Sequence, residues 1–367
     1  MTEAHQAPTA VDLFCGAGGL SHGLRLAGFK ILSAVDVDSD ACRSYELNHP
    51  GVPVHEDDIR KVDGKNLVKP GGSPLTLLAG CPPCQGFTRL NESSGRHDPR
   101  NSLVIEYARL VEELKPTCIF FENVPGLLRG GSSFFSKLQA VLSDLGYLSD
   151  PKVVQLADYG VPQRRRRLIV LAGKGFEIPL PQPTHARKPG KKSALQPWRT
   201  VRETLRGDQR LGRAHSFGVM RKRQQDPGPQ WHVARTLGDA LIEQLRQTPR
   251  SGGSREDLPD DFVQLQCHAG FNGFHDVYGR LDWDKPSVAI TSGCTNLSKG
   301  RFGHPENLRA LTPREAALLQ GFPADYQFKA SGMESVCRQI GNALPPPFAQ
   351  IVGQCVIDHL RKLKKLV

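Results

Sequence analysis

The chain has 367 residues, which suggests about two domains of ordinary size and excludes a fold too small to bury its own core. Its 48 lysines and arginines against 37 aspartates and glutamates give a formal net charge of +11, which favours a polyanionic partner, although a merely soluble basic surface would look the same. No segment approaches about 18 consecutive apolar residues and the first residues resemble no export signal, so we expect a cytoplasmic protein that does not span a membrane.

Five short apolar runs have the length and composition of strands buried on both faces. They are residues 10–14, 31–35, 75–79, 117–121 and 168–172. Apolar residues at helical spacing predict helices from Leu103 to Leu114, before Pro116, and from Phe134 to Leu145, before Gly146. Strands that alternate with helices predict a parallel, doubly wound α/β sheet.

The composition changes after Gly173, where EIPLPQPTHARKPGKKSALQP is rich in proline and cations and predicts a domain boundary near residue 176. From there to about residue 300 the periodicity is weak, and cations alternate with three tryptophans. Such a region is either a solvated face or a nucleic-acid surface, and we favour the second. Regular structure returns at LTPREAALLQGFP, where residues 312–315 predict the start of a helix and Gly321 its end.

Three glycines follow the first predicted strand in DLFCGAGGLSHGL. The dinucleotide fingerprint G-x-G-x-x-G fails, because Ser21 occupies the position of its third glycine. Asp36 at the end of the second strand is placed to accept hydrogen bonds from ribose hydroxyls, and Asp58 follows near the expected position of an adenine amino group. Together these features predict an adenosine-bearing ligand without requiring a pyrophosphate.

The stretch GCPPCQGFT contains Cys81 and Cys84 with two prolines between them. A zinc site needs about four ligands, and no second Cys-x-x-Cys is present, so we expect no metal. A zinc deaminase also fails, because its first cysteine follows a proline whereas Cys81 follows Gly80. A redox pair is an open alternative here, since a Cys-x-x-Cys can lower a thiol pKa. The nine cysteines are mostly isolated, which favours reduced thiols.

Seven motifs together resemble the cytosine-5 DNA methyltransferases of prokaryotic restriction-modification systems, in the order and spacing of that family. They are DLFCGAGG, GCPPCQGFT, DPRNSL at 98–103, Glu122-Asn123-Val124, QRRRR at 163–167, LTPREAALLQGFP and GNALPPP. The resemblance implies an α/β fold: a doubly wound S-adenosylmethionine-dependent methyltransferase domain with a smaller, irregular target-recognition domain. It implies a catalytic and cofactor-binding domain at residues 1–175, target recognition at 176–335, and a C-terminal segment, 336–367, that returns to the catalytic domain.

The resemblance also implies the reaction, which is methylation of C5 of a flipped-out cytosine in duplex DNA. C5 is a poor nucleophile, and a thiolate that adds at C6 makes it reactive. Cys84 matches the family's nucleophile, whereas we expect Cys81 to be a small buried filler. Glu122 would contact N3 and the exocyclic amine of the base. A β period places Arg165 and Arg167 on one face, with Arg167 near the base O2 and Arg165 supporting the glutamate or the phosphate side.

S-adenosylmethionine suits the glycine loop, because its sulfonium is a cation and it carries no phosphate. By motif position the cofactor-binding residues would be Phe14, Gly16, Gly18, Gly19, Asp36, Val37, Asp58, Ile59, Pro83, Leu103 and Asn342. A base inside a duplex cannot reach a thiol, so the target must flip out, and the expected DNA contacts in the polar segment 85–102 are Gln85, Thr88 and Arg100. We expect a monomer that binds double-stranded DNA, with a cognate restriction endonuclease as an open further partner.

Three rival functions are weighed against this one. Methylation of tRNA is less favoured, because the basic insertion and Gly86 in PPCQGFT favour DNA. A catalytically silent DNA- or cofactor-binding module is disfavoured by the intact set of Cys84, Glu122, Arg165 and Arg167. A Cys-x-x-Cys oxidoreductase predicts that Cys81 is as essential as Cys84. The sequence does not name the bases read, since direct readout depends on a few side chains in the middle region.

Overall fold

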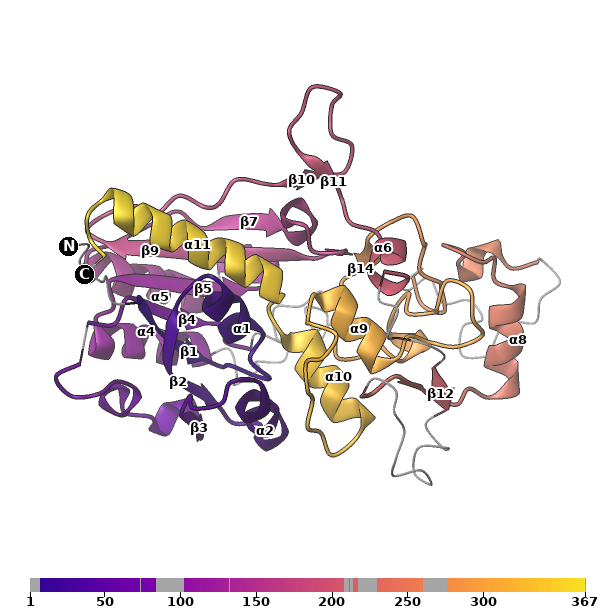
Figure 1. The fold of residues 1–367 in the computed structure, drawn as a ribbon, viewed down its shortest axis with the longest axis horizontal. Coiled ribbons are helices and arrows are strands. Elements are labelled where there is room, and N and C mark those ends of the chain that lie inside the picture. The colour runs from indigo at the N-terminus through magenta and orange to yellow at the C-terminus, as the bar shows by residue number, and fades with distance from the viewer. Residues whose placement is uncertain are drawn as a thin grey trace, which may run out of the picture. The chain divides into compact units, whose positions relative to one another are not determined.

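The structure is a computed structural model that describes residues 7–72, 74–83, 102–131, 133–207, 211, 214–216, 230–259 and 276–366. The chain divides into two compact units (Figure 1). Unit 1 comprises Met1–Tyr159, Arg166–Pro183 and Leu344–Val367, and unit 2 comprises Gly160–Arg165 and Thr184–Ala343.

Unit 1 is built on an eight-stranded sheet of order β3-β2-β1-β4-β5-β9-β6, in which β7 also pairs with β9. Its strands are β1 (Thr9–Leu13), β2 (Lys30–Asp36), β3 (Val54–Glu56), β4 (Leu77–Gly80), β5 (Cys118–Asn123), β6 (Tyr147–Ser149), β7 (Lys152–Gln155) and β9 (Arg166–Lys174). The first five are parallel, and β1, β4 and β5 are buried along their whole length, as their apolar runs predict.

The prediction of a wholly parallel sheet is wrong at one edge. β9 runs antiparallel to β5, β6 and β7. The chain returns from β7 to β9 through residues 156–165 without a long crossover helix, and a short return makes neighbouring strands antiparallel.

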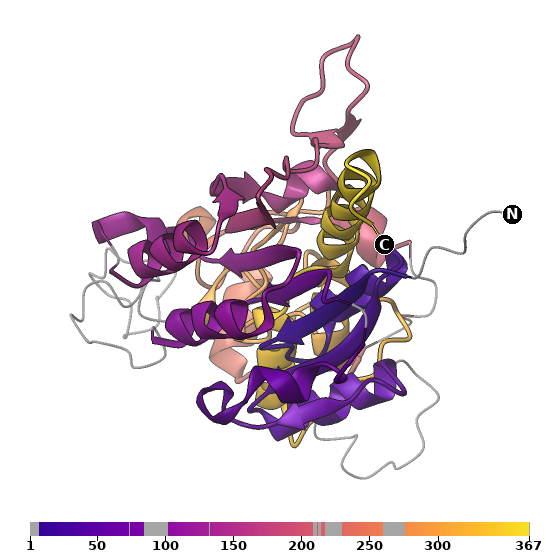
Figure 2. The same ribbon diagram turned by 90° about the vertical axis from the view of Figure 1, so that its left-hand side faces the viewer.

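Helices cover both faces of this sheet. They are α1 (Gly19–Leu26), α2 (Ser39–Asn48), α4 (Leu103–Leu114), α5 (Ser133–Asp144) and α11 (Pro346–Lys362). Figure 2 shows α4 and α5 on one face and the C-terminal α11 on the other. The predicted helices at 103–114 and 134–145 are confirmed, and Gly146 follows α5 with a left-handed φ of 80°.

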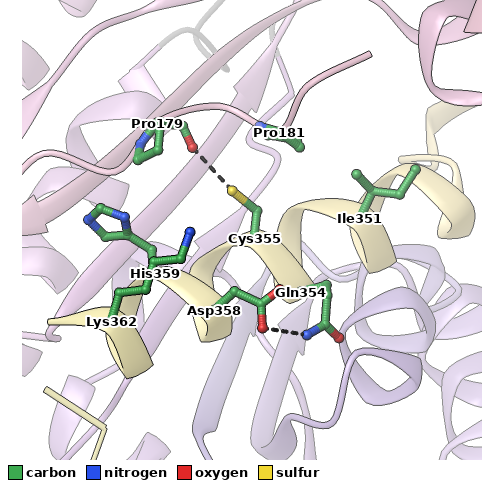
Figure 3. Close-up of a pocket in the computed structure, with 8 residues that line it drawn as sticks. All are labelled: Pro179, Pro181, Ile351, Gln354, Cys355, Asp358, His359 and Lys362. Carbon is green, nitrogen blue, oxygen red and sulfur yellow. Dashed lines mark hydrogen bonds between the residues drawn. The ribbon is translucent and has the colours of Figure 1, made fainter. Parts of the chain in front are cut away.

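The C-terminal helix α11 is packed tightly into unit 1. A Cβ atom on Gly23 of α1 would lie 2.3 Å from the carbonyl oxygen of Pro346, so only glycine allows the two helices to approach this closely. On another side of α11, the Cys355 thiol donates to the carbonyl of Pro179 at 3.2 Å (Figure 3). The last helix and the segment after β9 therefore belong to the unit that carries the sheet.

Unit 2 is irregular. Its described helices are α6 (Val201–Leu205), α8 (Asp239–Gln247), α9 (Pro313–Gln320) and α10 (Met333–Asn342), and its strands β8 (Gln163–Arg164), β10 (His185–Ala186), β11 (Gln196–Pro197), β12 (His215–Ser216), β13 (Val233–Ala234) and β14 (Ser287–Val288) have two residues each. The predicted start of α9 is confirmed, because Thr312 and Glu315 form a reciprocal capping box, and Gly321 ends the helix with a φ of 89°.

A buried guanidinium in unit 2 binds four backbone carbonyls. Arg280 is 1% exposed and donates to the carbonyls of Leu245, Thr248, His304 and Asn307. Burial lowers the pKa of Arg280. One side chain therefore ties the C-terminal end of α8 to the loop at residues 304–307.

Candidate active site

Four positions lie at neighbouring strand ends in unit 1. Leu13 of β1 pairs with Val35 of β2 and with Gly80 of β4. Gly80 in turn pairs with Phe121 of β5. The next residues along these strands form one row at the carboxyl edge of the sheet: Asp36, Phe14, Cys81 and Glu122. Doubly wound sheets bind their ligands at this edge.

The loop after β1 has a backbone that requires glycine. Phe14, Gly16 and Gly18 have φ values of 60°, 53° and 92°, all in the left-handed region. At Gly18 a Cβ atom would lie 2.4 Å from Nε2 of His49. Gly18 caps the N-terminus of α1 and Gly19 begins the helix. At Gly16 and Gly18 the loop therefore presents backbone without side chains, as close approach of a ligand requires.

Asp36 joins the ends of β1 and β2. Its Oδ2 accepts from the amide of Gly16 at 2.8 Å, and its Oδ1 accepts from the amide of Asp38 at 2.9 Å. Desolvation raises the pKa of Asp36, and these backbone donors oppose the rise. The next residue, Val37, keeps 71% of its surface exposed. A carboxylate beside an uncovered apolar side chain can hold a ribose and support an aromatic base.

The turn after β3 lies beside Asp36, because the amide of Asp57 donates to the Asp36 carbonyl at 3.1 Å. Asp58 caps a short 3-10 helix, and the Arg60 guanidinium contacts both of its carboxylate oxygens, the closest pair 2.6 Å apart. The hydrogen bond from Arg60 lowers the pKa of Asp58. Ile59 is buried. The arginine on Asp58 is a partner that the sequence did not indicate.

A buried polar chain beneath the glycine loop was also missed. Ser21 donates to Oδ2 of Asp12 at 2.6 Å, and the Tyr45 hydroxyl donates to Ser21 at 2.7 Å. Asp12 is fully buried, its Oδ1 has no hydrogen-bond partner among the described residues, and burial raises its pKa to about 7. These hydrogen-bonded side chains tie β1, α1 and α2 together. The sequence feature that could have indicated it is Asp12 itself, an acidic residue inside the first apolar run.

Glu122 forms an ion pair with Arg167. The Nε atom of Arg167 lies 2.7 Å from Oε1 of Glu122, which is only 7% exposed. The pair is close but lacks hydrogen-bond geometry, so Oε1 is a buried acceptor without a directed donor. The antiparallel β9 runs back along β5 and brings Arg167 to this glutamate, whereas Arg165, which we expected to support the glutamate or the phosphate side, donates to backbone carbonyls of unit 2.

Asn123 connects two of the motifs. Its side-chain amide donates to the carbonyl of Pro82 at 3.1 Å, which ties the segment after β4 to the end of β5. We expected Cys81 to be a small buried residue, but its side chain is only partly buried. It is the first residue beyond β4, where the sheet no longer covers it on both sides.

Arg165 and Gln163 lie in unit 2 and hold its loops. Arg165 is 3% exposed and donates to the carbonyls of Ile290, Gly341 and Ala343 at 2.7, 3.2 and 3.3 Å. Gln163 accepts from the amide of Ile290 at 3.1 Å and donates to carbonyl and amide oxygens at residues 319–320. Both side chains therefore pin residues 160–165 to the rest of this unit.

The remaining predicted residues divide into described and undescribed ones. Cys84, Gln85, Thr88 and Arg100 lie outside the described residues. Pro83 borders this gap, and Leu103, two residues beyond it, packs on the same core of unit 1 as Phe14. Asn342 is the exposed last residue of α10 in unit 2.

The predicted interleaving of cations and tryptophans is only partly an open surface. Trp283 is 7% exposed, and the Arg206 guanidinium lies 4.6 Å from its ring centroid. This tryptophan is therefore part of the packing of unit 2 and not an open stacking platform. The cations at positions 210, 213 and 221–223 lie outside the described residues.

Among the described residues, no group of three or more histidines, cysteines, aspartates and glutamates could hold a metal ion. In the same part of the chain, none of the helices combines the length and the apolar composition needed to cross a membrane.

The fold and the row of residues define a doubly wound α/β domain, a class of protein that binds its ligands at the carboxyl edge of the sheet. Residues 9–358 match the family model of the C-5 cytosine-specific DNA methylases. The chain is 36% identical to a Type II methylase, M.HgiDII of Herpetosiphon aurantiacus, over 96% of both chains. It is 32% identical to the Type II methyltransferase M.Eco47II of Escherichia coli, over 97% of this chain and 80% of the relative.

Solved structures agree. A candidate DNA modification methyltransferase encoded within an E. coli prophage superposes with a TM-score of 0.70 at 25% identity, covering 97% of this chain and all of that one. The Dnmt2 methyltransferase of S. pombe shares the fold, with a TM-score of 0.61 at 20% identity over 97% and 99% of the two chains. The chain belongs to the C-5 cytosine-specific DNA methylase family and is a DNA cytosine-5-methyltransferase, which confirms the resemblance carried by the seven motifs.

Proposed function

We propose that the protein transfers a methyl group from S-adenosylmethionine to C5 of a flipped-out cytosine in a specific duplex DNA sequence, through a transient bond between Cys84 Sγ and C6. The observation that supports this most directly is the Glu122–Arg167 pair at the carboxyl end of β5. Asn123, the neighbour of that glutamate, holds Pro82, two residues before Cys84. The proton-handling carboxyl group thus lies on β5, the strand that pairs with β4, and Cys84 follows β4 by four residues in the sequence, which supports a nucleophile and a proton-handling group at one site.

In the proposed reaction the Cys84 thiolate adds to C6, and the electron pair of the C5–C6 double bond becomes available at C5. Glu122 binds N3 and supplies a proton there as negative charge builds in the ring. Arg167, whose Nε lies 2.7 Å from Oε1, orients the glutamate from β9 toward the base. After methylation, loss of the C5 proton to solvent, departure of the thiolate from C6 and return of the N3 proton to Glu122 restore the aromatic ring and the starting enzyme.

S-adenosylmethionine, when bound, supplies an electrophilic methyl group on its sulfonium. The residues that would hold it fit that group: the glycine loop accepts close contact, Asp36 offers a carboxylate for ribose, and Val37 is an uncovered apolar surface for adenine. The Asp58 carboxylate and Ile59 would complete the adenine side, with Pro83, Leu103 and Asn342 as further contacts from the motif pattern. The absence of a phosphate-binding fingerprint agrees with a cofactor that has no phosphate.

We further propose that unit 1 carries catalysis and the cofactor, and that unit 2 reads the target sequence as a monomer on double-stranded DNA. Gln85, Thr88 and Arg100 would contact the extruded nucleotide and its phosphates. The similarity to Type II methylases supports a restriction-modification role, with a cognate endonuclease that cuts the same unmethylated site.

Duplex DNA that contains 5-fluorocytosine tests the proposal. The fluorine at C5 cannot be removed as the C5 proton is, so the covalent adduct is trapped. With a library of target sequences and S-adenosylmethionine, we expect an adduct that resists denaturation and maps to Cys84 by mass spectrometry. Cys84→Ser should abolish it, whereas the matched variant Cys81→Ser should retain it. Absence of the adduct in the natural protein would overturn the proposal, and an adduct with tRNA but not with duplex DNA would overturn the substrate assignment.

A further inference from the structure

A projecting loop of unit 2 carries cations that the proposed reaction does not use. Residues 184–200, which we call the basic hairpin although the short strands β10 and β11 pair in parallel, leave unit 2 at β10 and return at β11, and the loop between them extends away from the rest of that unit (Figures 1 and 2). The base of the hairpin is held by backbone hydrogen bonds from Gln196 to Thr184 and from Trp198 to Ala186, at 2.9 and 3.0 Å. A turn from Ser193 to Gly190, also 2.9 Å, shapes its tip.

The charge of the basic hairpin has one sign. It contains five exposed cations and no acid: Arg187, Lys188, Lys191, Lys192 and Arg199. No ion pair involves these five among the described residues. The cations that follow are different, because Arg202 and Arg206 pair with Asp284 and Glu306. The chain therefore neutralises its neighbouring arginines and leaves the hairpin uncompensated.

We propose that the basic hairpin binds the phosphate backbone of the duplex DNA that flanks the target site. The inference rests on the proposed function. The cations near the tip are accompanied only by small or polar residues and Pro189, so the tip lacks the apolar centre that a protein partner would need. Lysines and arginines on an ordered projection suit phosphates, which position a protein on DNA without reading its sequence.

The length of the hairpin sets how far it can reach. About five residues form each arm, and an extended residue spans at most roughly 3.5 Å, so the tip lies within roughly 17 Å of its base. That distance corresponds to about five base pairs of B-DNA at 3.4 Å each. The hairpin should therefore contact DNA a few base pairs beyond the segment that the body of unit 2 covers.

The test neutralises the tip and measures binding against salt. In the triple variant Lys188→Gln, Lys191→Gln and Lys192→Gln, the slope of log K against log salt concentration should become shallower by about 0.9 for each phosphate that the variant no longer binds. If each of the three lysines binds one phosphate, the affinity advantage of the natural protein should shrink about 40-fold between 50 and 200 mM salt. On a duplex trimmed to the target site the difference should disappear, because the hairpin then has no phosphate to bind.

The control removes the same charge at another surface. Lys30, Lys115 and Lys174 are exposed at the edge of the unit 1 sheet opposite its carboxyl edge. Their change to glutamine should leave the slope on long duplexes near that of the natural protein. Circular dichroism checks that both variants fold. Equal slopes for the natural protein and the hairpin variant on long duplexes would overturn the proposal, as would equal reductions in affinity on long and trimmed duplexes. Failure of the proposed function would show separately, as absence of the 5-fluorocytosine adduct in the natural protein.

Discussion

Single residues carry the parts of the site that sequence patterns describe least well. The QRRRR motif indicated important arginines, but adjacent arginines have different partners. Arg165 holds three carbonyls in unit 2, whereas Arg167 pairs with Glu122 in unit 1. The sequence could name the residue types that the chemistry needs, but their assignment depends on where strand β9 begins and in which direction it runs.

Asp12 gives a prediction at this scale. Burial raises its pKa from 3.8 to about 7, so the native state binds an extra proton between about pH 4 and pH 7. Stability contributed by the neutral form should therefore fall as pH rises through that window, by about 4 kcal/mol in total. Asp12→Asn keeps an acceptor for Ser21 and cannot ionise, so it should remove this fall. Thermal unfolding of unit 1 measured from pH 4.5 to pH 8 checks it.

The matched control for Asp12 is Asp144→Asn, which changes an exposed aspartate at the end of α5. It should unfold with the same pH dependence as the natural protein. If Asp12→Asn also follows the natural curve, the pKa of Asp12 is not raised in the folded state and the prediction is wrong.

At the scale of elements, local signals were reliable where a cap or an apolar stripe fixed the answer. The start and end of α9 and the spans of α4 and α5 follow from residues within the helix itself. Strand direction does not, because the run at 168–172 suits a parallel and an antiparallel strand equally. The connection through 156–165 decided it, and no apolar pattern encodes that connection.

The α9 cap can be tested directly. Thr312 accepts from the amide of Glu315 at 3.1 Å and contacts Nδ1 of His232 at 3.0 Å. Thr312→Ala should lower the free energy of unfolding by about 1 kcal/mol, within a range of about 0.5 to 2, because the Glu315 amide and His232 both lose the Thr312 hydroxyl as a partner. Hydrogen exchange of the α9 amides reports the loss. Thr312→Ser keeps the hydroxyl and should exchange almost as the natural protein does, so equal exchange in both variants would contradict the assignment.

At the scale of the whole molecule, the two units should respond differently to acid. In unit 2, burial lowers the pKa of His304 to about 4, and its Nδ1 accepts from the amides of Glu306 and Asn307. The native state therefore binds fewer protons than the unfolded chain between about pH 4 and 6.5, and stability falls as pH decreases through that window. In unit 1, His49, with a pKa lowered to about 3, acts in the same direction, but Asp12 opposes it.

We therefore expect unit 2 to open first on acidification from pH 7 to pH 5. Peptide-resolved hydrogen exchange, corrected for the intrinsic effect of pH, measures this. Glu315 and Arg309 also face His304 and shift its pKa in opposite directions, so the decisive comparison is His304→Gln, which cannot be protonated. That variant should reduce the acid sensitivity of unit 2, and earlier opening of unit 1 in the natural protein would contradict the prediction.

The sequence by itself determined the family, the α/β class and the residue types of the site, because catalytic motifs, strand composition and helix caps are short-range features. The tertiary structure decided which side chains meet: Arg167 with Glu122, Asn123 with Pro82, Asp12 with Ser21, and the inclusion of residues 160–165 in unit 2. These contacts join positions that are distant along the chain or lie in different elements, and their geometry follows from strand order and direction. No local pattern contains that information.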